Sequence, residues 1–162
     1  MSAVSIQRID LNDPAHVTAL LDLLDEYAGG PTGRGEGLDA AARARLPGML
    51  AQRPNYLGWV AFVGGQPAGL INCFEGVSTF RAQPLLNLHD IVVAPKFRRR
   101  GVATALIAAA EREAMARGCC KLTLEVLSGN HAAIHAYLKA GFAPYALDPE
   151  LGRAQFFEKK FY

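Results

Sequence analysis

Leu86–Gly118 reads LNLHDIVVAPKFRRRGVATALIAAAEREAMARG, and this stretch says more about the fold than any other in the chain. Its start, Leu86–Val93, is an apolar run typical of a β-strand, whereas Val102–Arg117 has helical apolar spacing and ends at a glycine. A short basic turn ending at Gly101 joins them. The first N–H groups of a helix lack partners within it, and the helix dipole favours negative charge there. We therefore expect a phosphate or pyrophosphate site at this turn.

The rest of the chain shows alternating strand patterns and helical patterns separated by turn signals. In chain order, the element types are β-α-α-β-β-β-α-β-α-β-β. This order predicts a mixed α/β sheet, antiparallel through its first four strands. The other expected strands are Val4–Asp10, Trp59–Val63, Ala68–Glu75, Leu122–Val126, Phe142–Leu147 and Gln155–Phe161, and the other helices are His16–Tyr27, Asp39–Gln52 and Ala132–Ala140.

Length and composition predict a single domain over residues 1–162. The chain is 51% hydrophobic, enough for a real core, but it has no apolar run of about 18 residues that would span a membrane. Its start lacks a signal-peptide pattern, and its three cysteines are odd in number with no metal-ligand spacing. We therefore expect a cytoplasmic protein with reduced thiols and no metal site. A net charge of +2 gives no reason to expect nucleic acid.

Two motifs resemble those of one known family. Arg98–Ala103 (RRRGVA) resembles the acetyl-coenzyme A signature of GNAT N-acetyltransferases, R/Q-x-x-G-x-G/A. Asn130–Phe142 (NHAAIHAYLKAGF) is similar to their second signature. The order of the expected elements also matches that family. The resemblance implies a GNAT-type fold, in which helices flank a mixed, mostly antiparallel twisted sheet, and an acetyl-CoA-dependent N-acetyltransferase.

The resemblance also implies where acetyl-CoA, the cosubstrate, binds. In GNAT proteins the pyrophosphate lies on backbone amides of the signature loop, and the pantetheine arm pairs like an added strand with the preceding strand. That pairing requires the strands Leu86–Val93 and Leu122–Val126 to splay apart. Two of the arginines have an alternative role as solvated side chains, Arg99 and Arg100. The residues assigned to the cosubstrate are Ile91, Val92, Val93, Arg98, Arg99, Arg100, Gly101, Val102, Ala103, Thr104, Asn130 and Tyr137.

Acetyl transfer to an amine needs a deprotonated amine, a donor for the thioester oxyanion and a proton for the leaving thiolate. Tyr137 matches the family tyrosine that donates to the departing sulfur, and the alternative is a tyrosine that only packs one helix face. A phenol with a pKa near 10 is protonated at neutral pH. The backbone N–H of Val92 or Val93 is the nearest candidate for the oxyanion donor.

Two residues compete for the role of general base. Glu125 lies where the ribosomal-protein N-terminal acetyltransferases, which resemble this segment, have their base, and a solvated glutamate is the alternative. His89 and Asn87 occupy positions where arylalkylamine acetyltransferases carry two histidines, so the pair is incomplete here. His89 could still relay a proton through water, or be an ordinary hydrogen-bonded histidine. Strand alternation places Asp90 on the face opposite His89, which favours a structural role.

The acceptor is a small-molecule amine or an amine of a protein or peptide, and the sequence does not choose between them. We expect the cleft walls at Tyr27–Gly37, Val77–Pro84 and Phe142–Gly152, and the first of these is rich in glycine. A function of another class is a non-catalytic acyl-CoA-binding sensor, which would need neither Tyr137 nor a base. A homodimer is an open alternative to a monomer.

Overall fold

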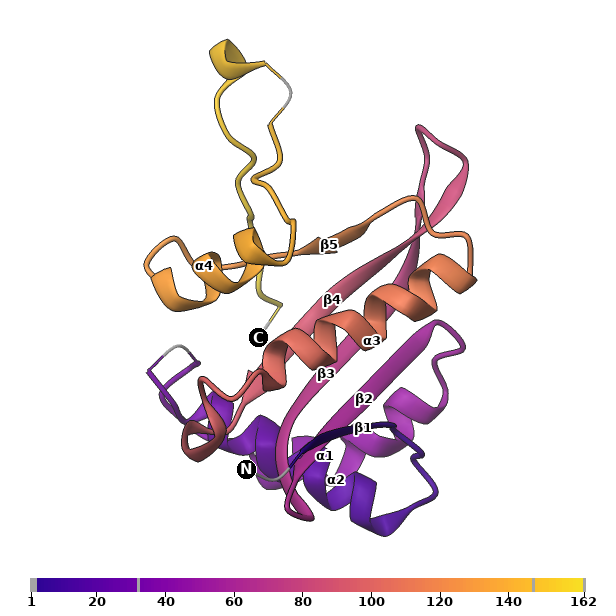
Figure 1. Ribbon diagram of the computed structural model, residues 1–162, viewed down its shortest axis with the longest axis vertical. Helices are drawn as coiled ribbons and strands as arrows, with labels where there is room; N and C mark the ends of the chain where they lie inside the picture. The colour runs from indigo at the N-terminus through magenta and orange to yellow at the C-terminus, as the bar shows by residue number, and fades with distance from the viewer. Residues whose placement is uncertain (1–2, 32, 147, 162) are drawn as a thin grey trace.

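The computed structural model describes residues 3–31, 33–146 and 148–161, which form one five-stranded sheet of order β1-β2-β3-β4-β5 with helices around it (Figure 1). β1 to β4 run antiparallel to their neighbours and β5 runs parallel to β4, as predicted. The elements are β1 (Val4–Arg8), α1 (Pro14–Ala28), α2 (Ala40–Ala51), β2 (Tyr56–Val63), β3 (Gln66–Ser78), β4 (Gln83–Val93), α3 (Val102–Ala116), β5 (Leu122–Leu124) and α4 (His131–Lys139), with short 3-10 turns at Pro95–Phe97 and Pro149–Leu151.

The first two helices begin at capping residues. The side chain of Asp13 accepts a hydrogen bond from the backbone N–H of Ala15 at 2.8 Å, and a proline opens α1. Asp39 caps α2 in the same way, through the N–H of Ala42 at 2.7 Å. Both helices lie behind the sheet, and no helix in the described ranges is long and apolar enough for a membrane span (Figure 1).

α3 packs on the opposite face of the sheet, and Gly69 of β3 allows its close approach (Figure 1). A Cβ at Gly69 would lie 2.5 Å from the backbone oxygen of Val92 and 2.9 Å from the side chain of Val102, the first residue of α3. A larger residue would therefore push the start of α3 away from the sheet. Because Gly69 faces α3, alternation places the odd-numbered residues of β3 toward α3 and the even-numbered ones toward α1.

β4 contains a β-bulge at His89. Asn72 of β3 pairs with Asp90, but the next residue, Cys73, pairs with Leu88, so His89 has no partner on β3. An extra residue of this kind shifts the alternation of side chains along a strand. Leu88 therefore faces α3 while Asp90 faces the α1 side. The bulge also explains how His89 and Asp90 can both contact the α1 side, in contrast to the predicted alternation.

The strands β4 and β5 splay apart, as predicted for a pantetheine site. β4 pairs with β5 only from Leu86 to Leu88, against Leu122 to Leu124. Beyond these pairs, β5 ends, whereas β4 continues to Val93. The last five residues of β4 therefore have no partner on the β5 side among the described strands.

Two strand predictions are wrong, and a third strand is shorter than predicted. The strand expected at Leu122–Val126 ends at Leu124, because the chain there leaves β4. The closing strands expected at Phe142–Leu147 and Gln155–Phe161 are absent from described residues 142–146 and 155–161, and Leu147 lies outside the described residues. Pro144 cannot donate to a strand ladder, and the short β5 offers little edge for pairing. The segment runs out from the body instead (Figure 1), and Phe156, Phe157 and Phe161 are exposed.

Candidate functional site

The turn before α3 has the backbone geometry expected of an anion site. Gly101 caps the helix in the left-handed conformation, with φ 78°. Its carbonyl accepts the first helical hydrogen bond, from the N–H of Ala105 at 3.0 Å. The N–H groups of Val102, Ala103 and Thr104 are thus the ones an α-helix leaves without a partner. The strained backbone, rather than a lack of space, requires glycine here, because a Cβ at Gly101 would meet no protein atom within 4 Å.

Three exposed arginines directly precede the start of α3 in the chain. Arg98, Arg99 and Arg100 are all exposed, and Arg99 is itself left-handed at φ 60°. The guanidinium of Arg100 lies 5.6 Å from the ring centre of the buried Phe97. The turn thus anchors an aromatic ring in the core and presents positive charge to solvent. This arrangement fits a pyrophosphate at the start of α3.

The open end of β4 leads to this turn. Val92 is buried, and Ile91 and Val93 are half-buried. Their side chains pack, while the strand edge facing β5 has no neighbour in the described part of the sheet. A strand edge of this kind can pair with an extended ligand through backbone groups. The open edge of β4 is thus followed in the chain by the turn at the start of α3.

Tyr137 and Asn130, both on or next to α4, are the site residues of the second motif. Asn130 caps α4, since its side-chain oxygen accepts a hydrogen bond from the N–H of Ala133 at 3.2 Å. The sequence analysis missed this structural role. Tyr137 is half-buried, and its ring centre lies 6.0 Å from that of Phe142. Burial raises the pKa of Tyr137, and nearby Tyr27 raises it further, so the phenol keeps its proton at neutral pH.

The two candidate bases are both exposed. Glu125 follows the end of β5 and makes no side-chain hydrogen bond within the described residues. The ring of His89 lies edge-on to that of Phe74, with 5.4 Å between the ring centres. Asn87 donates a hydrogen bond to the hydroxyl of Thr123 at 3.0 Å, so it links β4 to β5. The geometry does not favour one base over the other.

Asp90 lies in a hydrogen-bonded chain that the sequence analysis missed. The hydroxyl of Tyr56 donates to Oδ1 of Asn72 at 2.9 Å, and Nδ2 of Asn72 donates to Oδ2 of Asp90 at 3.0 Å. The chain crosses three neighbouring strands, β2, β3 and β4. It forms because the bulge at His89 turns Asp90 to the same face as Asn72. Strict alternation, which we assumed, cannot reveal a bulge.

The cysteines and ion pairs described below do not indicate a second catalytic centre. Burial raises the pKa of Cys73 to about 12, and it also raises that of Cys119, so neither thiol ionises readily. Glu75, on the α3 side, pairs with Arg117 at 3.3 Å. In the described ranges, no three His, Cys, Asp or Glu side chains lie close enough to hold a metal ion.

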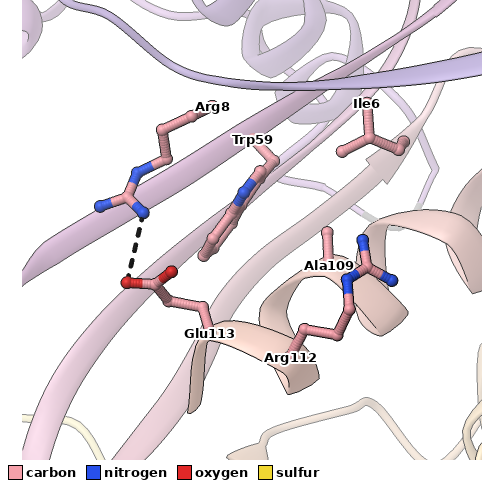
Figure 2. A pocket seen from close by; sticks show the side chains of 6 residues that line it. All are labelled: Ile6, Arg8, Trp59, Ala109, Arg112 and Glu113. Carbon is pink, nitrogen blue, oxygen red and sulfur yellow. Dashed lines mark ion pairs between the residues drawn. The ribbon is translucent and has the colours of Figure 1, made fainter. Parts of the chain in front are cut away.

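A hollow of about 270 Å³ lies away from these residues, between β1, β2 and α3 (Figure 2). The guanidinium of Arg8 lies 4.9 Å from the ring centre of Trp59 and pairs with Glu113 at 3.5 Å, as the dashed line in Figure 2 shows. The ion pair occupies one side of the hollow, and none of the predicted site residues lines it. The lining residues are Ile6, Arg8, Trp59, Ala109, Arg112 and Glu113.

Comparison with known proteins identifies proteins that are similar in sequence. Residues 18–142 match the model of the acetyltransferase (GNAT) family. The thialysine N-epsilon-acetyltransferase of Caenorhabditis elegans is 28% identical over 124 residues, which are 76% of this chain and 75% of that protein. The streptothricin acetyltransferase of Streptomyces lavendulae is 39% identical over 90 residues, 56% of this chain. The chain aligns with only 48% of the streptothricin enzyme's length and with 38% of an N-acetyltransferase from Methanocaldococcus jannaschii.

Solved structures share the fold at low sequence identity. An aminoglycoside N-acetyltransferase, AAC(6')-Iy, solved in complex with CoA, superimposes with a TM-score of 0.77 at 21% identity. The match covers 99% of this chain and 97% of that one. At this identity the likeness concerns the arrangement of helices and strands alone.

Proposed function

Because the chain belongs to the acetyltransferase (GNAT) family, we propose that it transfers an acetyl group from acetyl-CoA to a primary amine by direct attack on the thioester. One observation carries the proposal. The left-handed Gly101 at the start of α3 follows, across a short turn, the strand β4, whose edge toward β5 is open from His89 to Val93. A ligand with a pyrophosphate and an extended amide-bearing arm fits both features. The raised thiol pKa values of Cys73 and Cys119 give no support to a covalent intermediate on either residue.

The residues that would hold the cosubstrate divide into three groups. Backbone N–H groups of Val102–Thr104 would bind the pyrophosphate, with Arg98, Arg99 and Arg100 beside it. The backbone of Ile91–Val93 would pair with the pantetheine arm. Asn130 would donate to the arm through its side-chain NH2, because its oxygen already caps α4.

The chemical step would depend on few side chains. Tyr137 would donate its proton to the leaving sulfur, and its raised pKa means that this proton is present at neutral pH. Glu125 or His89 would take the amine proton through water. A backbone N–H of Val92 or Val93 would stabilise the oxyanion of the thioester carbon.

The relatives favour a small-molecule amine as the acceptor. Streptothricin and an aminoglycoside appear in the names of two similar proteins. We therefore propose a small amine rather than a protein amine. A cytoplasmic location and a dimer stay predictions.

The first test is a titration with acetyl-CoA, coenzyme A and a longer acyl-CoA. Gly101→Glu places a negative side chain where the pyrophosphate would bind, so we expect affinity for all three to fall at least about 100-fold. Gly118→Glu is a matched control, because Gly118 is left-handed at φ 71°, has no atom within 4 Å of a Cβ and lies at the other end of α3.

Equal loss of affinity in both variants would show that strain, rather than the pyrophosphate, causes the effect. A wild-type protein that binds none of the three ligands would contradict the proposal. Binding without transfer to any amine would instead indicate the non-catalytic acyl-CoA sensor.

A further inference from the structure

We infer that Asp90 binds the charged amino group of the acceptor, and that Asn72 and Tyr56 hold its carboxylate in position. The inference rests on the proposed function and specifies the kind of amine that the site accepts. It would make Asp90 a specificity-determining residue and the other two positioning residues.

The hydrogen-bonded chain fixes one oxygen of the carboxylate. Asn72 is only 3% exposed, so its amide must use its hydrogen-bonding groups inside the protein. Its oxygen accepts from Tyr56 at 2.9 Å, and its nitrogen therefore points to Oδ2 of Asp90 at 3.0 Å. A tyrosine hydroxyl that donates at one end sets the direction of the whole chain.

The other oxygen of the carboxylate is free to bind a ligand. Oδ1 of Asp90 makes no hydrogen bond to any residue in the described ranges, and neither oxygen belongs to an ion pair there. Those ranges contain no buried side-chain oxygen or nitrogen without a partner, so Oδ1 is open to solvent. Asp90 thus combines a fixed orientation with one unused acceptor and an unneutralised negative charge.

The position of Asp90 suits an amine that attacks a thioester at the open edge of β4. It is the second residue beyond Leu88, where pairing with β5 stops. Phe74 and His89 lie on the same side of the sheet. Burial raises the pKa of Tyr27, the charge of Asp90 raises it further, and α1, which carries Tyr27, lies against β4.

These surroundings select a cationic amine with an apolar body. A primary alkylamine is almost entirely protonated at neutral pH, and its ammonium group donates to carboxylates in charge-assisted hydrogen bonds. The aromatic rings beside Asp90 supply apolar contact and faces that attract cations. An aromatic amine, which is neutral at the same pH, would gain nothing from the carboxylate.

The test compares benzylamine, which is charged at pH 7, with aniline, which is neutral. Acetyl transfer to each is measured for the wild type, Asp90→Asn and the control Glu111→Gln, which removes an exposed carboxylate on α3. For Asp90→Asn we expect kcat/KM for benzylamine to fall about 10- to 100-fold, mainly through KM, while that for aniline stays within about 2-fold. Glu111→Gln should change neither.

Tyr56→Phe tests the positioning chain, because it removes only the hydroxyl that donates to Asn72. KM for benzylamine should rise about 3- to 10-fold without a change in kcat or in aniline transfer. Equal losses for both amines in Asp90→Asn, no loss for either, or a wild type that acetylates neither amine would overturn the inference. Acetyl-CoA binding, titrated in the same samples, separates these results from a failure of the proposed function.

Discussion

The N-terminal region (residues 4–116) and the C-terminal region (residues 125–161) differ in how their apolar side chains are covered. Within the described residues, every buried hydrophobic residue lies at or before Ala114. By contrast, Leu127, Leu138, Tyr145 and Phe157 are all more than half exposed. Most of the hydrophobic stabilisation therefore comes from the N-terminal region.

The difference matters because the proposed site draws on both regions. The phosphate turn, the open edge of β4 and Asp90 belong to the N-terminal region, whereas Glu125, Asn130 and Tyr137 belong to the C-terminal region. We expect variants of the buried apolar residues in the first region to change stability, and variants of Glu125, Asn130 and Tyr137 in the second region to change activity alone.

Leu70→Ala should show the largest effect, because Leu70 is fully buried at the centre of the sheet. Removing its side chain leaves a cavity, so the free energy of unfolding should fall by about 2–5 kcal/mol. Phe157→Ala in the C-terminal region, where the side chain is 82% exposed, should change it by less than about 0.5 kcal/mol. Denaturant unfolding measures both, and a large loss for Phe157→Ala would contradict the contrast between the regions.

Tyr137→Phe should reduce activity without changing stability. Loss of the phenol proton should lower kcat by about 100-fold, while acetyl-CoA affinity and the unfolding midpoint stay near the wild-type values. Steady-state kinetics with saturating acetyl-CoA gives the first quantity, and thermal unfolding gives the last. An unchanged kcat would show that Tyr137 only packs against Phe142.

Glu113→Gln should lower the free energy of unfolding less than Leu70→Ala does, and only at a pH above the pKa of the Glu113 carboxylate. The hydrogen bond from Arg117 lowers the pKa of Glu113, with Arg8 adding to the shift, so the folded state favours the charged carboxylate. Its stabilisation is therefore present above the ordinary pKa of glutamate and is lost as the pH falls through the lowered value. The difference from wild type should be below about 1 kcal/mol at pH 7 and should vanish in acid.

Denaturant unfolding at several pH values measures this difference. A difference that grows as the pH falls would contradict the assigned sign. A loss as large as that of Leu70→Ala would show that surface ion pairs, and not the core, separate the two regions.

The sequence predicted the N-terminal region well because its signals are local. Alternation, caps and apolar spacing identify the first four strands and three of the helices, and the two motifs identify the family. It failed at the end of the chain, where the pattern suggested a closing pair of strands at Phe142–Leu147 and Gln155–Phe161. Such a pattern needs a long free edge to become a strand, and the three-residue β5 does not supply one.

The candidate site was predictable only in part. Glycine and arginine in a short motif predicted the turn before α3, because the backbone requires glycine at a positive φ. Asp90 was misplaced because a bulge depends on pairing with a neighbouring strand, which no local pattern encodes. The chain from Tyr56 through Asn72 likewise joins residues that are far apart in the sequence.

The bulge at His89 also bears on how this family member tolerates insertions and deletions. Before the bulge, the even-numbered residues of β4, such as Leu86 and Leu88, face α3; after it, Asp90 and Val92 face the other way. Deleting His89 would leave Leu88 and Asp90 as successive residues of a regular strand, so Leu88 would still face α3 and Asp90 would still face the α1 side. If His89 were instead kept in regular alternation without the bulge, the carboxylate of Asp90 would turn toward the apolar contact with α3. The strand can therefore lose this one residue and keep Leu88, Asp90 and Val92 on their present faces, whereas regular alternation through His89 would turn Asp90 and Val92 over.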